Sequence, residues 1–197
     1  MVGNPRDGGA ARVIFETERL VLREMTQDDA EALAAILKDP EVMYAYGHDF
    51  TDRDVREWLD RQRARYARYG FGLWAVTLKT SPYMIGQAGI TMQPYKGGEV
   101  LEAGWLLNKA YWHRGYAREA ASACARYAFG TLGADSLCSI IKADNAASIK
   151  VAESIGMTNA DEFITRYYGG DMFHYLYAVD KYAARVNPPA VEPKAFY

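Results

Sequence analysis

The pattern of apolar and polar positions predicts a strand and a helix at the start of the chain. Within residues 15–24, the alternation around Leu20 and Leu22 is typical of a half-buried strand. Thr26 lies three residues before an aspartate, as in a capping box, and apolar side chains then recur at helical spacing until Pro40. This predicted helical stripe consists of Ala30, Leu33, Ala34 and Leu37.

Residues 41–49 show no hydrophobic period and are interpreted as a loop. Thr51 and Asp54 then form a second capping signal, which predicts another helix. Its partly aromatic stripe consists of Val55, Trp58, Leu59, Gln62 and Tyr66. Such a stripe is more often core than ligand site, although here it adjoins a tyrosine-rich loop.

The rest of the chain alternates strands and helices. Ser81-Pro82 is expected to end a strand, and Lys96-Gly97-Gly98-Glu99 predicts a hairpin turn. The predicted strands are 71–79, 84–93, 100–108, 136–142, 158–168 and 172–182, and the predicted helices are 116–132 and 145–156. This order indicates an α+β or mixed α/β fold in which helix 116–132 crosses between neighbouring strands.

The ends of the chain differ from its middle. Residues 1–12 are glycine-rich and polar, and we expect a flexible N-terminal tail. Residues 184–197 contain three prolines and are expected to be an extended C-terminal tail. No second-domain boundary interrupts residues 13–183, so we expect a single domain, which suits a length of 197 residues.

Composition argues against several classes of function. Half of the residues are hydrophobic and the formal net charge is −2, which is typical of a soluble protein. No segment resembles a membrane span or a leader peptide, so a cytoplasmic location without membrane association is expected. No stretch is basic enough to predict a nucleic-acid partner. Four arginines that do cluster on one predicted helix, among acidic residues, are interpreted as a solvated face: Arg61, Arg63, Arg65 and Arg68.

Cysteines and histidines give no sign of a metal site. Cys124 falls in an apolar helix and Cys138 in a strand, so two buried free thiols are expected. The three histidines are scattered along the chain and predict no metal centre.

The turn Trp112-His113-Arg114-Gly115-Tyr116-Ala117-Arg118 is the strongest candidate for a binding site. It follows a predicted strand and opens a long helix, whose N-terminal amides can bind an anion. Gly115 allows close approach of a ligand to the backbone because it lacks a β-carbon. An ordinary strand-to-helix connection remains the alternative on local pattern alone.

Three segments together resemble the GNAT acetyltransferase superfamily, in its RimJ/RimL-type branch of ribosomal-protein N-terminal acetyltransferases. They are the opening 17–23 (TERLVLR), the turn 111–120 (YWHRGYAREA) followed by Tyr127-Ala128-Phe129, and 144–148 (DNAAS) followed by 153–157 (ESIGM). The resemblance spans about residues 15–180. It implies a mostly antiparallel central sheet with helices on both faces and two strands that splay apart at the cofactor site.

The resemblance implies acetyl-CoA as the donor and no metal. The pyrophosphate would be bound by the turn residues His113, Arg114, Gly115, Tyr116, Ala117 and Arg118. The pantetheine arm would lie between strands 102–107 and 137–142, near the backbone of Trp105, Leu106 and Leu107, and Asn145 would bond it. The superfamily's usual glutamine or arginine three residues before the glycine is replaced here by Trp112, as is common in this branch.

The chemistry sets the catalytic roles, and the resemblance implies which residues would fill them. A protonated amine cannot attack a thioester, so the acceptor must lose a proton. Glu102 matches the position of a glutamate that activates the amine in many relatives, and the alternative is a structural or surface carboxylate. The tyrosine acid of many relatives is replaced by Ala152. Ser148 is the substitute candidate, with hydrogen bonding at the helix start as an equal alternative.

The resemblance to the RimJ/RimL-type branch implies that the acceptor is a peptide or protein N-terminal α-amine. Aromatic residues in the expected acceptor regions are candidates to bind it, namely Tyr44, Tyr46, His48, Trp58 and Tyr168. The alternatives are a small-molecule amine such as an amino acid, polyamine or antibiotic, and a catalytically silent acetyl-CoA-binding module. An unrelated phosphate-binding α/β protein is disfavoured because the turn lacks a dinucleotide fingerprint and a P-loop. A monomer and a homodimer are both compatible with the sequence.

Overall fold

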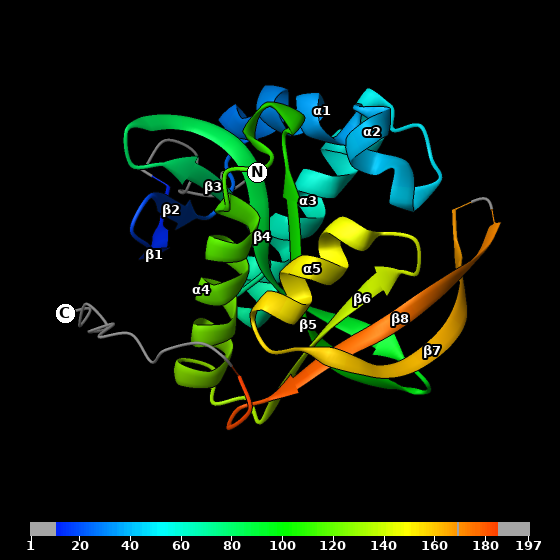
Figure 1. Ribbon diagram of the computed structural model, residues 1–197. Coiled ribbons are helices and arrows are strands. Elements are labelled where there is room, and N and C mark those ends of the chain that lie inside the picture. The colour runs from blue at the N-terminus through cyan, green and yellow to red at the C-terminus, as the bar shows by residue number, and fades with distance from the viewer. Residues whose placement is uncertain (1–10, 169, 185–197) are drawn as a thin grey trace.

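The structure, a computed structural model, describes residues 11–168 and 170–184. Its strands form one eight-stranded sheet in the order β1-β2-β3-β4-β5-β6-β8-β7 (Figure 1). The strands are β1 (Val13–Glu16), β2 (Leu20–Arg23), β3 (Leu73–Leu78), β4 (Ser81–Tyr95), β5 (Gly98–Leu107), β6 (Ser136–Lys142), β7 (Thr158–Tyr167) and β8 (Gly170–Asp180). All neighbouring pairs are antiparallel except β5 and β6, which are parallel. The predicted mixed fold with a mostly antiparallel sheet is therefore confirmed.

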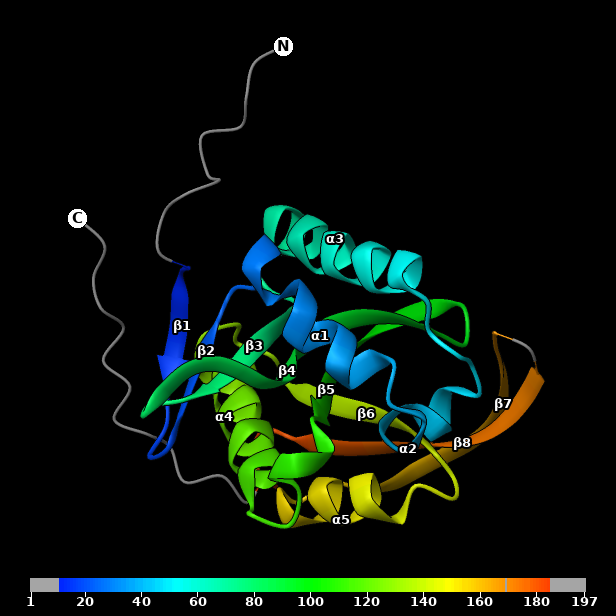
Figure 2. The same ribbon diagram turned by 90° about the horizontal axis from the view of Figure 1, so that it is seen from above.

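Helices cover both faces of the sheet (Figure 2). Helices α1 (Ala30–Leu37) and α3 (Asp52–Tyr69) lie over one face, and α4 (Tyr116–Gly130) and α5 (Ala146–Ser154) lie over the other. This arrangement creates two hydrophobic cores, one on each side of the sheet. Helices on both faces are what the sequence resemblance implied.

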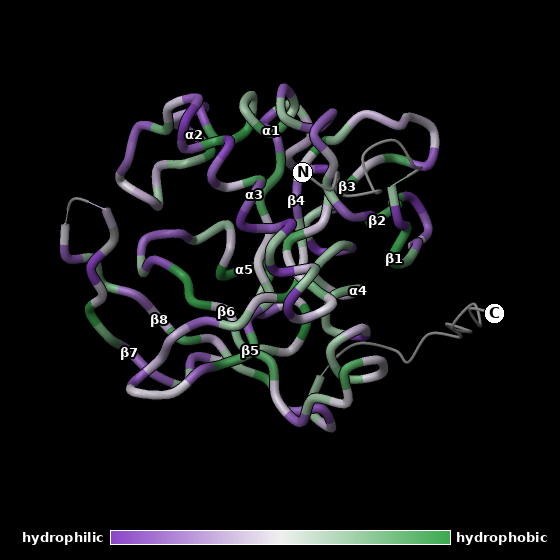
Figure 3. The backbone as a smooth tube through the Cα atoms, turned by 180° about the vertical axis from the view of Figure 1, so that it is seen from behind, coloured by the Kyte–Doolittle hydropathy of each residue, from purple (hydrophilic) through white to green (hydrophobic). Residues whose placement is uncertain are grey.

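The two cores follow from the alternation of side chains along the strands. In β3, Trp74 and Val76 pack on the side of α4, whereas Leu73 and Ala75 pack on the side of α1 and α3. Helix α3 is largely hydrophilic (Figure 3) and turns one stripe toward the sheet. The buried residues of that stripe are Val55, Trp58, Leu59 and Gln62.

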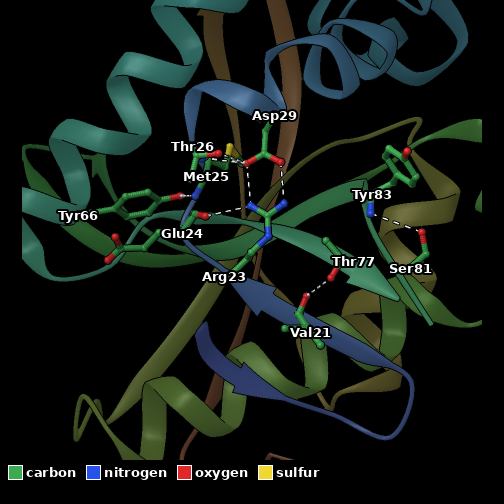
Figure 4. A network of polar contacts seen from close by, with 10 residues as sticks. All are labelled: Val21, Arg23, Glu24, Met25, Thr26, Asp29, Tyr66, Thr77, Ser81 and Tyr83. Carbon is green, nitrogen blue, oxygen red and sulfur yellow. Dashed lines mark hydrogen bonds and ion pairs between the residues drawn. The ribbon is translucent and has the colours of Figure 1, made fainter. Parts of the chain in front are cut away.

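Polar contacts fix α1 and α3 against the strands (Figure 4). The Tyr66 hydroxyl of α3 donates to the carbonyl of Leu73 and accepts from the backbone N–H of Met25 at 3.3 Å. Arg23 of β2 binds both carboxylate oxygens of Asp29 with two bonds of 2.7 Å. A bidentate pair of this kind fixes orientation as well as distance. The inward face of α3 is thereby held in one position over the sheet.

The predicted capping and turn signals are confirmed. Thr26 with Asp29 and Thr51 with Asp54 both form capping boxes. The hairpin between β4 and β5 turns through Lys96-Gly97, whose φ angles of 44° and 84° are typical of a type I′ turn.

Residues 15–24 do not form the single strand that was predicted. They form β1, a turn and β2, which pair with each other as an antiparallel hairpin. Thr17 closes the turn: its backbone N–H donates to the carbonyl of Leu20 at 2.9 Å, and its hydroxyl accepts from the N–H of Leu20 at 2.9 Å. A local side-chain bond has therefore replaced continuation of the strand.

The prediction of a loop over residues 41–49 is wrong for residues 41–46. A short helix α2 (Pro40–Met43) is followed by a 3-10 helix, Tyr44–Tyr46. The Asp39 side chain caps α2 by accepting from the backbone N–H of Glu41 at 2.8 Å, and proline suits the first helical position. Helices this short have no periodic stripe, so the hydrophobic pattern could not reveal them.

Ser81-Pro82 does not end a strand but begins β4. The register between β3 and β4 shifts there, from the pair Thr77–Met84 to the pair Leu78–Ser81. Pro82 lies in this irregular stretch, where a missing backbone N–H breaks no regular ladder pair.

The parallel pair β5 and β6 positions the site. The two strands meet in a single register pair, Glu102 with Cys138. Away from it, β5 stays paired with β4 and β6 stays paired with β8, so the two strands diverge. The part of β5 beyond Glu102 therefore has a backbone edge without a strand partner on the β6 side. This confirms the predicted splay.

Candidate active site

A cavity of about 140 Å³ opens where β5 and β6 diverge, beneath α3 and the segment around α2. It is bounded on one side by polar residues of α3, β4 and β5 and on the other by β6 and the start of α5. The polar side chains of the first wall are Arg65, Gln87, Thr91, Gln93 and Glu102. A polar cavity at a gap in a sheet is a natural place for a ligand to bind.

Glu102 lies at the fork between the two strands. Its Oε1 accepts from the backbone N–H of Ile140 at 3.2 Å, and its Oε2 accepts from the Thr91 hydroxyl at 3.1 Å. Burial raises the pKa of Glu102, although the hydrogen bonds from Ile140, Thr91 and Gln93 and the charge of Arg65 act in the opposite direction. A carboxylate with a raised pKa that reaches a cavity is suited to accept a proton near neutral pH.

Gln87 of β4 lines the cavity and carries a buried hydrogen-bond donor. Its Oε1 accepts from the indole Nε1 of Trp58 at 2.9 Å, and because an indole can only donate, this bond fixes the amide orientation. The side chain is fully buried, and its Nε2 has no hydrogen-bond partner within residues 11–168 and 170–184. A buried donor without a partner is costly unless a ligand or water satisfies it.

Arg65 of α3 brings a positive charge to the same wall. Its Nη1 donates to Oε1 of Gln62 at 3.1 Å, and that fully buried glutamine also accepts from the N–H of Leu73 at 3.2 Å. Burial, and next the nearby charge of Arg61, lower the pKa of Arg65. The solvated helix face predicted for the arginine cluster is therefore wrong for Arg65, because Arg65 lies on the side of α3 that faces the sheet.

The predicted anion-binding turn adopts a suitable backbone. Gly115 is the N-cap of α4 with φ of 78°, and His113 has φ of 59°. Left-handed residues before a helix turn successive backbone N–H groups to one side, which creates a site for an anion. The predicted residues of this turn lie outside the cavity wall, namely His113, Arg114, Gly115, Tyr116, Ala117 and Arg118.

The first hairpin holds this turn in place. Arg19 donates through Nη1 to the carbonyl of Arg114 at 3.0 Å and through Nε to Glu119 at 2.7 Å, and its guanidinium lies 4.6 Å from the ring centre of Tyr116. The Glu119 carboxylate also accepts from the Thr17 hydroxyl at 2.5 Å. The opening segment of the resemblance thus has a structural role next to the turn.

Asn145 and Ser148 both line the cavity at the start of α5. The Asn145 side-chain oxygen caps the helix by accepting from the backbone N–H of Ser148 at 3.0 Å, which leaves its amide NH2 to bind a ligand. Helix-start bonding thus uses the backbone of Ser148 and not its hydroxyl. Ala152 is fully buried.

Two of the three β5 residues predicted to contact the donor line the cavity, and the third does not. Trp105 and Leu106 line the cavity, next to the unpaired edge of β5. Leu107 is 6% exposed and lies outside the cavity wall, and its carbonyl accepts from the indole of Trp112 at 2.9 Å. This bond ties the end of β5 to the turn.

The predicted acceptor residues fall into separate places. Tyr46 lines the cavity. Tyr44 is exposed, and the centre of its ring lies 5.6 Å from Nζ of Lys142. The rings of His48 and Tyr168 stack with their centres 4.2 Å apart. This contact joins the segment before α3 to the β7–β8 hairpin. Trp58 is 7% exposed and contributes its donor to Gln87.

Sequence reasoning missed the cavity roles of Arg65, Gln87, Thr91 and Gln93. Gln87 and Thr91 lie in an otherwise apolar stretch of β4, and polar residues at such positions were the available signal. Within the described residues, no group of three or more histidine, cysteine or acidic side chains is arranged to hold a metal ion. No helix in that part of the chain has the length and apolar character needed to cross a membrane.

The fold and sequence match known proteins. The model of the acetyltransferase (GNAT) domain family matches residues 19–158. The uncharacterized protein YkkB of Bacillus subtilis (strain 168) is 36% identical over 148 residues, which cover 75% of this chain and 86% of that protein. The crystal structure of an acetyltransferase from Agrobacterium tumefaciens str. C58 superposes with a TM-score of 0.73 at 29% identity, covering 91% of this chain and 100% of that chain. RimL, a ribosomal L7/L12 alpha-N-protein acetyltransferase, has the same fold with a TM-score of 0.73 at 16% identity. The superposition covers 90% of this chain and 98% of that chain.

Proposed function

Because the chain belongs to the GNAT acetyltransferase family and is an acetyl-CoA-dependent N-acetyltransferase, we propose that it transfers the acetyl group directly to a peptide N-terminal α-amine, with Glu102 as general base. The observation that carries this proposal is the position of Glu102, whose carboxylate has a raised pKa and reaches the cavity at the fork between β5 and β6. The peptide acceptor rests on the sequence resemblance and on the aromatic residues around the cavity.

Three features support a binding path for the donor: the turn before α4, the unpaired edge of β5 and the start of α5. The backbone amides of residues 113–118 would bind the pyrophosphate, with Arg114 and Arg118 as charge partners. The unpaired edge of β5 would bind the pantetheine amides as a strand does, and the Asn145 amide would add a bond from the other side. A backbone N–H at Trp105 to Leu107 would polarise the acetyl carbonyl.

Glu102 would take the proton from the acceptor ammonium group. The neutral nitrogen then forms a bond to the acetyl carbonyl carbon, the carbon–sulfur bond breaks, and sulfur leaves with the electron pair. The nitrogen loses its second proton, which passes through the Ser148 hydroxyl to the sulfur, and Glu102 releases the first proton to solvent. A thiol comparable to cysteine has a pKa of about 8.5, so the thiolate can leave without a strong acid. Ser148 is our proposed proton donor to it, because the position of the missing tyrosine is the buried Ala152.

The acceptor would enter between α2, the residues after it and the β7–β8 hairpin. Tyr46 would contact it directly from the cavity wall, whereas Tyr44, His48 and Tyr168 would contact the residues that follow the amine. Trp58 would act on the acceptor through Gln87.

A thiol-release assay with acetyl-CoA tests this proposal. We expect CoA release with peptides that have a free N-terminus and none with the same peptides after N-acetylation. Free amino acids, polyamines and aminoglycosides form the comparison panel. Release with polyamines or aminoglycosides alone would contradict the peptide acceptor. Binding of acetyl-CoA without release on any amine would contradict the transferase reaction and indicate a silent module.

A further inference from the structure

Arg65 is a charged side chain of the cavity wall that makes no direct ion pair within the described residues, and the carboxylate of Glu102 in the same wall acts on its charge only through space. Lys142 also lines the cavity, but it forms an ion pair with Asp144 at 2.8 Å. Arg65 forms no ion pair in the described part of the chain. Its neighbour on the solvent side, Arg68, is exposed and stacks on Tyr69 at 4.8 Å.

The geometry of Arg65 is fixed before any ligand arrives. One of its five N–H donors is bound by Gln62, whose own orientation is set by donation from Leu73 and by its bond to the carbonyl of Trp58 at 3.3 Å. The remaining donors have no acceptor among the described side chains. A half-buried guanidinium with one hydrogen bond and no direct ion pair lacks most of the contacts that normally offset the loss of hydration.

Gln87 adds an independent observation. Its Nε2 is fully buried, has no partner in the described residues, and belongs to a side chain that lines the same cavity. The cavity thus contains a cationic donor and a neutral donor from α3 and β4, together with the carboxylate of Glu102. Groups of this kind are complementary to a ligand that carries both an ammonium group and an anion.

From this arrangement we infer that the acceptor carries a carboxylate close to its reacting amine and that Arg65, assisted by Gln87, binds it. The inference rests on the proposed function, because the amine is placed by Glu102. In a peptide the α-carboxylate of the first residue is used in the amide bond, so the anion is then the side chain of an N-terminal aspartate or glutamate. A free amino acid would offer its α-carboxylate instead.

Arg65 contributes to the choice of acceptor and not to the acetyl-transfer step. A carboxylate matches the planar guanidinium bidentately, and charge-assisted bonds of this kind are stronger than neutral ones. Loss of the carboxylate from the acceptor, or of the guanidinium from the enzyme, should therefore raise KM about tenfold to a hundredfold and change kcat less. Arg65→Lys should recover part of the preference, since it keeps the charge but not the fork.

The test compares matched acceptors on matched variants. Wild-type protein, Arg65→Gln, Arg65→Lys and the control Arg68→Gln are assayed with peptides that begin with Asp or with Asn, and with free aspartate and its diamide. We expect a preference for the carboxylate member of a pair in wild type and Arg68→Gln, and its collapse in Arg65→Gln. Preference within the peptide pair identifies the side-chain carboxylate, and preference only for the free amino acid identifies the α-carboxylate.

A second measurement separates this inference from the proposed function. Calorimetric titration of an N-acetyl-aspartyl peptide, the reaction product, into protein saturated with CoA reports anion binding without turnover. Binding that is weakened in Arg65→Gln but not in Arg68→Gln supports the inference even if no transfer is observed. Equal binding by wild type of the carboxylate and amide members of both product pairs, the N-acetyl-Asp and N-acetyl-Asn peptides and N-acetylaspartate and its diamide, overturns it, even if acetyl transfer to peptides is efficient.

Discussion

Glu102 and Ile140 are joined across the fork of the sheet: the carboxylate Oε1 accepts the backbone N–H of Ile140 at 3.2 Å. Glu102 is the β5 residue of the single pair between β5 and β6, and Ile140 lies two residues beyond its partner on β6. The side chain therefore bridges the strands where their backbones begin to separate. One carboxylate thus serves both the architecture of the gap and its chemistry.

Replacement of Glu102 by Gln should remove the proposed base while preserving this bridge. Glutamine retains an oxygen for the N–H of Ile140, so the fold should persist. We expect kcat to fall about 10²- to 10⁴-fold, because proton abstraction is lost, with a small change in acetyl-CoA affinity. Steady-state kinetics and calorimetry measure these quantities. Glu99→Gln, an exposed position on the same strand, is the control, and a Glu102→Gln enzyme of normal kcat would remove Glu102 from the mechanism.

The pH dependence of activity should report the same carboxylate. Glu102 must be ionised to accept a proton, so kcat/KM should fall as pH decreases through its pKa. Because burial raises that pKa, the fall should lie above the ordinary value of 4.5. The charge of Arg65 lowers the pKa of Glu102. In Arg65→Gln the acid side of the kcat/KM profile should therefore move to higher pH. If the acid side of the kcat/KM profile lies at the same pH in wild type and in Arg65→Gln, the titrating group is not Glu102.

The Glu119 carboxylate should make stability depend on pH in the acid range. Burial opposes its ionisation, but bonds from Thr17 and Arg19 outweigh burial, and the pKa lies below the ordinary 4.5. Glu119 thus stabilises the fold above that ordinary value, and its contribution disappears as pH falls through the lowered pKa. Glu119→Gln should lower the free energy of unfolding by about 1–3 kcal/mol at pH 7.

Urea unfolding at pH 7 and at acid pH tests this sign. The difference between wild type and Glu119→Gln should shrink in acid, whereas exposed Glu18→Gln should match wild type at both. A difference that grows as pH falls would show that the carboxylate is not stabilised in the folded state.

The two thiols should be inert in the folded protein. Cys124 is fully buried and Cys138 is 5% exposed, and burial raises the pKa of each to about 12. Thiolates are the reactive species, so a disulfide reagent at pH 8 should modify neither residue in the native state. Both should react after denaturation. Rapid labelling of one native thiol would mean that its core opens locally.

Residues whose role depends on local sequence were predictable, and those whose role depends on packing were not. Gly115 and Asn145 stand at helix starts that short motifs mark, and the structure places both there as N-caps. Arg65 shares its spacing with three other arginines, and what distinguishes it is the contact of α3 with the sheet. That contact is set by Tyr66 and Gln62, which bond to Leu73 of the neighbouring strand β3. Helical period alone could not show which arginine faces the cavity.

Gly115 should tolerate no β-branched residue without loss of the donor. Its φ of 78° lies in the left-handed region, which valine adopts only with strain, and the neighbouring amides would have to turn away. A new β-carbon would lie 3.4 Å from Nη2 of Arg19, an ordinary contact, so the surrounding packing should survive. We expect Gly115→Val to weaken acetyl-CoA binding by at least about tenfold, with far-UV circular dichroism unchanged. Gly133→Val, also left-handed with open space around it, controls for backbone strain alone, and unchanged acetyl-CoA affinity in folded Gly115→Val would refute pyrophosphate binding at this turn.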